Sequence, residues 1–170
     1  MTAIQRKYLL FALVGGLTLF ADQVTKILVR RDLPAYGQAG KSIFGRTLVL
    51  LHAENTGIAF SQFRSLPGGR VVLSLVAATA LAIVVSYLHR ADPAEAALVA
   101  CLGLVGGGTA GNLLDRARFG QVTDFVLVDF GFWPFHPWAV FNVADAALVV
   151  GVILIVMTLM RQRRLPENHP

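Results

Sequence analysis

The chain has 170 residues, of which 55% are hydrophobic and 15% are charged, whereas a soluble domain carries about 25% charged residues. This composition excludes an ordinary soluble domain and predicts an integral membrane protein with one domain over residues 1–170. The net charge of +5 does not indicate nucleic-acid binding, because the basic residues flank apolar segments and form no patch interleaved with aromatic residues.

Four apolar segments approach or reach the roughly 20 residues that a helix needs to cross a bilayer. A spanning segment must satisfy its backbone hydrogen bonds internally, so all four are predicted to be helices. The predicted fold class is therefore an all-α membrane protein with four transmembrane helices. We expect the helices at about residues 8–29, 71–88, 96–114 and 138–160.

A small β-sheet is predicted between the first two helices, within about residues 40–66. Residues 47–51 and 57–60 are rich in β-branched, aromatic and other apolar side chains, and Asn55 begins an Asn-Thr-Gly sequence that favours a turn between them. We expect this sheet to lie at the outer membrane surface.

The even number of helices places both termini on one side of the membrane. The basic residues on that side lie in short segments close to the helix ends, which favours the cytoplasm for the termini.

Unusual polar residues occur at the outer ends of the predicted helices and in the outer segments. The first and third helices run outward and the fourth runs inward. The C-terminal ends of the first and third helices and the N-terminal end of the fourth therefore lie on the same side of the membrane. We therefore expect one group of polar side chains near the outer interface: Asp22, Lys26, Asn55, Asn112, Asp115, Arg116, Asp124, Asn142 and Asp145.

Asp124 and Asp145 are the strongest candidates for chemistry. Asp145 interrupts an apolar segment and has no basic partner nearby in the sequence. Two carboxyl groups close together in a poorly hydrated site share a proton and suit general acid–base catalysis. One takes a proton from water, while the other donates a hydrogen bond to the scissile carbonyl and assists the leaving amine. The same chemistry suits a proton-coupled transporter, in which Asp22 and Asp145 relay protons, so both classes remain open here, as does a non-catalytic assembly factor.

The other polar residues also have structural interpretations. Asp22 and Lys26, four residues apart, suit a helical ion pair. Asp115 and Arg116 suit the end of the third helix and the orientation of catalytic groups, and Asn55 suits a turn. The four histidines show no ligand spacing, so no metal site is predicted.

Five short motifs occur in order along nearly the whole chain: DQVTK at 22–26, NTGIAF at 55–60, GTAGNLLDR at 108–116, VTDF at 122–125 and FNVAD at 141–145. With these motifs on a four-span chain, the protein resembles the lipoprotein signal peptidases, also called type II or prolipoprotein signal peptidases, of bacterial inner membranes. No motif position departs from the family pattern.

The resemblance implies an aspartic peptidase with Asp124 and Asp145 as its catalytic pair. Asp115 is expected to orient catalytic groups. Gly108 lies in a run of small residues that permits close approach by substrate or by another helix. The remaining positions implied to support the site or contact substrate are Asp22, Lys26, Asn55, Asn112, Arg116 and Asn142.

The resemblance also implies the partners and the location. Family members remove the signal peptide of a prolipoprotein on the N-terminal side of a cysteine that carries diacylglycerol. They act within membrane lipid, need no metal or organic cofactor, and are inhibited by the cyclic peptide globomycin. We therefore expect a multi-pass inner-membrane protein with cytoplasmic termini and an active site near the periplasmic face.

Overall fold

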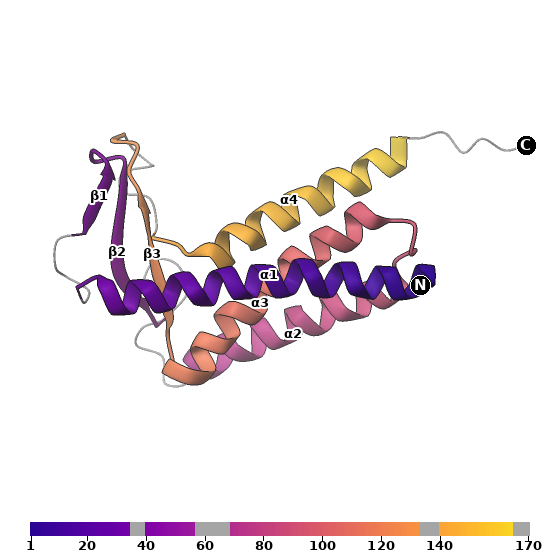
Figure 1. Ribbon diagram of the computed structural model, residues 1–170, viewed down its shortest axis with the longest axis horizontal. Coiled ribbons are helices and arrows are strands. Elements are labelled where there is room, and N and C mark those ends of the chain that lie inside the picture. The colour runs from indigo at the N-terminus through magenta and orange to yellow at the C-terminus, as the bar shows by residue number, and fades with distance from the viewer. Residues whose placement is uncertain (35–39, 57–68, 133–139, 165–170) are drawn as a thin grey trace, which may run out of the picture.

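The computed structural model describes residues 1–34, 40–56, 69–132 and 140–164. In this part of the chain, four helices form a bundle, and a three-stranded antiparallel sheet stands across one end of it (Figure 1). The predicted fold class is confirmed. The helices are α1 (Ala3–Asp32), α2 (Gly69–Arg90), α3 (Ala96–Phe119) and α4 (Val143–Arg164), and the strands are β1 (Lys41–Phe44), β2 (Leu48–Asn55) and β3 (Val122–Val128).

The four predicted helices exist, and each extends beyond at least one of its predicted limits. α1 starts at Ala3 because Thr2 and Gln5 form a reciprocal capping box at its first turn. The prediction ended the third helix at residue 114, before the first charged side chain, whereas α3 continues to Phe119. It stops at Gly120, whose φ of 76° suits the left-handed conformation that commonly ends helices.

The predicted start of the fourth helix, at residue 138, is wrong. α4 begins at Val143, and residues 138 and 139 lie outside the described residues. Phe141 instead pairs with Val126 of β3 in an antiparallel bridge, in which each backbone N–H donates to the other residue's carbonyl at 2.8–3.0 Å. This pairing holds the chain extended until Asn142.

The sheet has the order β1-β2-β3, with both pairs antiparallel. β2 covers most of the predicted strand at 47–51, whereas the predicted strand at 57–60 lies outside the described residues. Asn55 is the last residue of β2 and pairs with Val122, and the turn predicted to begin there continues into residues outside the described part of the chain. The third strand, β3, was not predicted, and its register places Asp124 opposite Ala53.

α3 lies at the centre of the bundle. In its apolar window 67% of the residues are buried, compared with 11–17% in the other three helices. Glycines of α3 allow this packing: a Cβ at Gly103 would lie 2.9 Å from the Cβ of Val14 in α1, and one at Gly108 would lie 3.1 Å from the Cγ of Leu148 in α4. The helix-packing interpretation of Gly108 thus matches its surroundings.

All four helices are long and apolar enough to cross a membrane. Large apolar side chains cover their outward faces, among them Leu13 and Leu17 on α1, Val76 on α2 and Met157 on α4, each more than half exposed. Such faces suit hydrocarbon rather than water, and the chain is a multi-pass membrane protein.

Candidate active site

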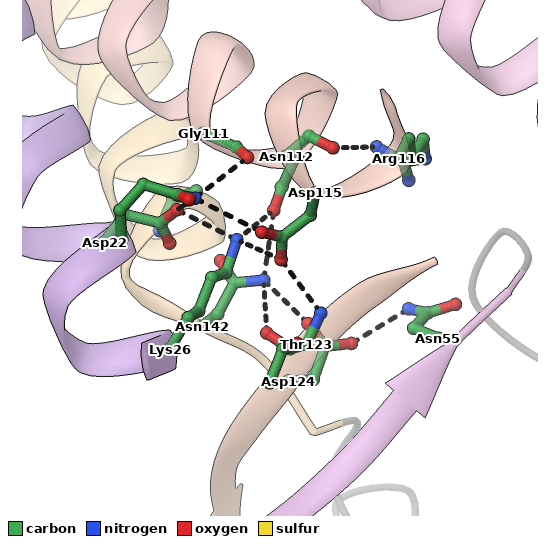
Figure 2. A network of polar contacts seen from close by, with 12 residues as sticks. Asp22, Lys26, Asn55, Gly111, Asn112, Asp115, Arg116, Thr123, Asp124 and Asn142 are labelled. Atoms are coloured by element: carbon green, nitrogen blue, oxygen red, sulfur yellow. Dashed lines mark hydrogen bonds and ion pairs between the residues drawn. The ribbon is translucent and has the colours of Figure 1, made fainter. Parts of the chain in front are cut away.

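A continuous network of polar side chains fills the junction between the helix ends and the sheet (Figure 2). Its members come from α1, α3, β2, β3, α4 and the residue that precedes α4. The structure brings together eight of the residues that the sequence had indicated: Asp22, Lys26, Asn55, Asn112, Asp115, Asp124, Asn142 and Asp145.

Lys26 forms the centre of the network. Its ammonium group lies 2.9 Å from Asp22 Oδ2 and 3.2 Å from Asp115 Oδ2, and it donates to Asn112 Oδ1 at 2.9 Å. All three charged side chains are fully buried. An ammonium group has three N–H donors, and three acceptors surround this one. A buried charge is tolerated when it is paired and fully hydrogen-bonded, as Lys26 is here.

Asp115 connects this ion pair to β3. Its Oδ2 also accepts a hydrogen bond from the backbone N–H of Thr123 at 3.1 Å, while the Oδ1 accepts from Gln23 Nε2 at 3.3 Å. Gln23 also donates to the carbonyl of Gly111 and to Asp22 Oδ2. These contacts fix the start of β3 against the outer turns of α1 and α3.

Lys26 determines the orientation of the Asn112 amide. Because an ammonium group can only donate, the amide oxygen must face Lys26, and the amide nitrogen then points the other way. That nitrogen donates to Asp145 Oδ1 at 2.8 Å. Asn112 therefore presents a fixed donor to Asp145.

The first turn of α4 is built into the network. The Asn142 side-chain oxygen accepts from the backbone N–H of Asp145 at 2.9 Å, and Asp145 Oδ2 accepts from the backbone N–H of Asn142 at 3.2 Å. This reciprocal pair satisfies backbone donors that a helix start otherwise leaves unpaired. A third such donor, the backbone N–H of Ala144, reaches Asp22 Oδ1 at 3.0 Å. Asp145 is thus both a helix-capping residue and a half-buried acid in the network.

Asp124 lies in the middle of β3 and is 2% exposed. Its Oδ1 accepts from Asn142 Nδ2 at 2.7 Å, and its Oδ2 accepts from Asn55 Nδ2 at 2.9 Å. Burial, and to a smaller extent the charge of Asp145, raises the pKa of Asp124 from 3.8 to about 6, against the opposing effect of the two asparagine hydrogen bonds.

Arg116 and Gly108 occupy the margins of this site. Arg116 is half-buried and donates to the carbonyl of Asn112 at 3.4 Å. The charges of Asp145, Asp124 and Asp115 all act on its guanidinium group. Gly108 lies about one turn before Asn112 on α3 and faces the backbone of Ala144.

Two carboxyl groups bound to one asparagine can carry out acid–base chemistry. Asn142 connects Asp124, through its side-chain nitrogen, with Asp145, through its backbone N–H and side-chain oxygen. In the described part of the chain, every buried side-chain nitrogen and oxygen atom has a hydrogen-bond partner. In the same part, no group of three or more His, Cys, Asp or Glu side chains is placed to hold a metal ion.

Three network residues were not predicted from the sequence: Gln23, Arg30 and Thr123. Gln23 and Thr123 lie inside the quoted motifs, beside Asp22 and Asp124, so adjacency was the only signal for them. Arg30 follows Lys26 by four residues, which places both on one face of α1.

Comparison with protein families gives a match over residues 14–161 to the family described as Signal peptidase (SPase) II. A lipoprotein signal peptidase of Geobacter metallireducens is 38% identical over 160 residues, which cover 92% of this chain and 94% of the relative. A lipoprotein signal peptidase of Sphingopyxis alaskensis is also 38% identical over 160 residues, covering 92% and 88%.

Solved structures have the same fold. One, described as a bacterial membrane enzyme determined by the in meso method at 2.3 Å resolution, superposes with a TM-score of 0.81 at 22% identity. The match covers 94% of this chain and 93% of the other. A second bacterial membrane enzyme, at 1.9 Å resolution, gives a TM-score of 0.77 at 23% identity and covers 88% and 91%.

Proposed function

Because the chain belongs to the signal peptidase II family, we propose that it cuts prolipoproteins on the N-terminal side of a diacylglyceryl-modified cysteine. It is an aspartic-type peptidase with a signal peptidase role in a membrane. We propose that Asp124 and Asp145 carry out the hydrolysis and that the other network residues hold them in place.

The arrangement around Asn142 is the observation that carries this proposal. Asp124 and Asp145 come from a strand and a helix that are far apart in sequence, yet both bind the same asparagine. Asn112 and Asn55 each donate to one of the two carboxyl groups, so each carboxyl has two fixed donors. A pair of carboxyl groups held in this way requires little reorganisation during reaction.

In the proposed reaction, one carboxylate takes a proton from a water molecule whose oxygen attacks the carbonyl carbon of the scissile peptide. The other carboxyl, in its protonated form, donates a hydrogen bond to the carbonyl oxygen. When the C–N bond of the tetrahedral intermediate breaks, the amine leaves with a proton from the pair. The products are the free signal peptide and a lipoprotein that begins with the modified cysteine.

We assign the protonated role to Asp124. Its pKa of about 6 lets it take up a proton at a higher pH than an ordinary carboxyl group does. Asp145, the other member of the pair, then acts as the base.

The lipid anchor of the substrate fits the position of the network. We propose that the sheet faces the periplasm of a bacterial inner membrane and that both termini are cytoplasmic. The N-terminus and the end of α4 lie at the opposite end of the bundle from the sheet (Figure 1). A cysteine held by its acyl chains at the outer interface would then meet the pair without moving into the bilayer.

Membership of the family does not favour a proton-coupled transporter. A proton path needs polar groups through the depth of the membrane, whereas residues 71–88 and 146–160 carry no charge. A pH-driven flux in proteoliposomes would reverse this ranking.

The test is cleavage of a diacylglyceryl-modified precursor by the purified protein and by its Asp124→Asn and Asp145→Asn variants. Asparagine keeps the size of the side chain and one of its two acceptor oxygens, but it cannot exchange a proton. We expect each variant to lose about 10²- to 10⁴-fold in kcat while remaining folded.

Asp32→Asn is the matched control. Asp32 is the last residue of α1, at the sheet end of the bundle, but its side chain is half exposed and pairs with Arg31. It should cleave at the rate of the unmodified protein. Globomycin should block cleavage by both proteins. Full cleavage by the Asp145→Asn variant would remove Asp145 from the proposed pair.

A further inference from the structure

Arg30 lies at the edge of the network and takes no direct part in the proposed chemistry. Its guanidinium group lies over the ring of Phe119, 4.6 Å from the ring centre, and Nη1 lies 3.7 Å from Asp115 Oδ1. The same Nη1 donates to the side-chain oxygen of Thr123 at 2.7 Å. The side chain is 22% exposed, so it is fixed by contacts on two sides and reaches solvent on another.

Thr123 is held at each of its polar groups. Its hydroxyl accepts from Arg30, its backbone N–H donates to Asp115, and its carbonyl accepts from Asn142 at 3.4 Å. These three partners come from α1, from α3 and from the residue before α4. Thr123 is 4% exposed and immediately precedes Asp124.

We propose that Arg30 is a positioning residue that sets the place of Asp124 by holding Thr123. This inference rests on the proposed role of Asp124 in cleavage. Within the described residues, Arg30 forms no hydrogen bond or ion pair with either carboxyl group of the pair, so it acts through the backbone of β3. Displacing residue 123 displaces the next Cα, and with it the carboxyl group that Asn55 and Asn142 bind. A displacement of about 1 Å at a reacting group can lower a rate by roughly 10²-fold.

The contacts of Arg30 require an arginine rather than a positive charge. A planar guanidinium group can stack on Phe119 and direct one N–H at Thr123, whereas a lysine ammonium has no flat face and no fixed fork. Arg31 provides the contrast within the same helix turn. It pairs with Asp32, and the two side chains are 69% and 52% exposed.

The experiment measures kcat and KM for cleavage of a diacylglyceryl-modified precursor by Arg30→Lys, Arg31→Lys and Thr123→Val. Thr123→Val keeps the shape of the side chain and both backbone bonds, but it removes the hydroxyl acceptor. We expect Arg30→Lys and Thr123→Val each to lower kcat by about 10- to 100-fold with KM within about twofold of the unmodified value. Arg31→Lys should match the unmodified protein.

The double variant Arg30→Lys/Thr123→Val distinguishes positioning from two unrelated losses. If Arg30 acts through Thr123, the double variant should be no slower than the slower single variant. Multiplied effects would overturn the proposal, as would equal kcat for Arg30→Lys and Arg31→Lys.

Hydrogen exchange separates a failure of this inference from a failure of the proposed function. The amide of Thr123 should exchange faster in Arg30→Lys than in Arg31→Lys, because its residue is held less firmly. If the unmodified protein does not cleave the precursor, the proposed function fails and exchange alone decides whether Arg30 holds Thr123. Equal exchange in the two variants would show that Arg30 does not hold β3.

Discussion

Two lysines of α1 are buried at opposite ends of the bundle, and their surroundings differ. Lys26, at the sheet end, contacts two carboxylates and the Asn112 amide and is fully buried. Lys7, at the other end, is 6% exposed and donates to the carbonyl oxygens of Ala91 at 3.1 Å and His89 at 3.4 Å. Tyr8 lies beside it and bonds His89 Nδ1 at 2.8 Å.

The difference shows that burial of a lysine does not by itself indicate a functional site. Lys7 binds main-chain oxygens where α2 ends, and the last carbonyls of a helix carry partial negative charge that any nearby cation can satisfy. Lys26 is instead the shared cation of two carboxylates that are fully buried. The polar chemistry of the molecule is therefore concentrated at one end, and four predictions test that contrast.

Lys26→Met should have the largest effect. Removing one partner of a buried ion pair leaves uncompensated charge and costs about 3–5 kcal/mol. Here Asp22 and Asp115 both lose their shared cation. Unfolding in detergent, followed by circular dichroism, measures the loss. If the single variant does not fold, Lys26→Met/Asp22→Asn, with one charge fewer, should recover part of the stability. A Lys26→Met protein as stable as Lys7→Met would end the contrast.

The stability of the sheet end should also depend on pH through Asp124. Its pKa is about 6 in the folded protein and 3.8 for an ordinary carboxyl group, so the folded state binds the proton more tightly. The resulting stability is complete below pH 3.8 and is lost as pH rises through 6. The total is about 3 kcal/mol, since one pKa unit corresponds to about 1.4 kcal/mol.

Asp124→Asn removes this dependence, so the difference in unfolding free energy between the two proteins should change across that pH range and then level off. Denaturation in detergent at a series of pH values measures it. A difference that stayed constant with pH would mean that Asp124 titrates normally.

Gly111→Ala should disturb the sheet end by crowding. An added Cβ would lie 3.0 Å from the Cγ of Asp22, so the Asp22–Lys26 pair must shift. Overpacking of this kind costs about 1–3 kcal/mol. Gly16→Ala is the control, because a Cβ there meets nothing within 4 Å. Thermal unfolding of both variants checks the prediction, and equal midpoints would contradict it.

Lys7→Met should have the smallest effect. It removes two hydrogen bonds to main-chain carbonyls and leaves no unpaired buried carboxylate, so we expect a loss of about 1 kcal/mol. The kcat for the lipidated precursor should not change. A large fall in kcat would show that the two ends of α1 are coupled.

The sequence predicted the helices and the convergence of the polar residues for physical reasons that need no structure. A run of uncharged residues long enough to cross a bilayer must be helical, and helices that alternate in direction bring alternate ends together. These two facts placed Asp22, Asn112 and Asn142 at the same depth in the membrane. In the structure Asn142 donates to Asn112, which also accepts from Lys26, and Asp22 accepts from the backbone N–H of Ala144. Which of them take part in catalysis stays a prediction.

The features that the sequence did not predict depend on pairing between distant segments. β3 forms because Val122 to Val128 pair with β2, about 70 positions earlier, and nothing local in the sequence specifies that partner. The true start of α4 depends on a bridge between Phe141 and Val126, which is also non-local. Charge misled the prediction at α3, where Asp115 is fully buried inside the helix rather than beyond its end.

The contacts of Lys7 have a consequence for the order in which the chain assembles. During synthesis α1 and α2 emerge before α3, the helix on which each of them packs in the finished bundle. In the described residues, the main chain of α1 approaches α3 and α4 but not α2. The bonds from Lys7 and Tyr8 to His89 and Ala91 need only the first 91 residues. They can close the first helical hairpin while the ribosome is still adding the glycine-rich helix that completes the core.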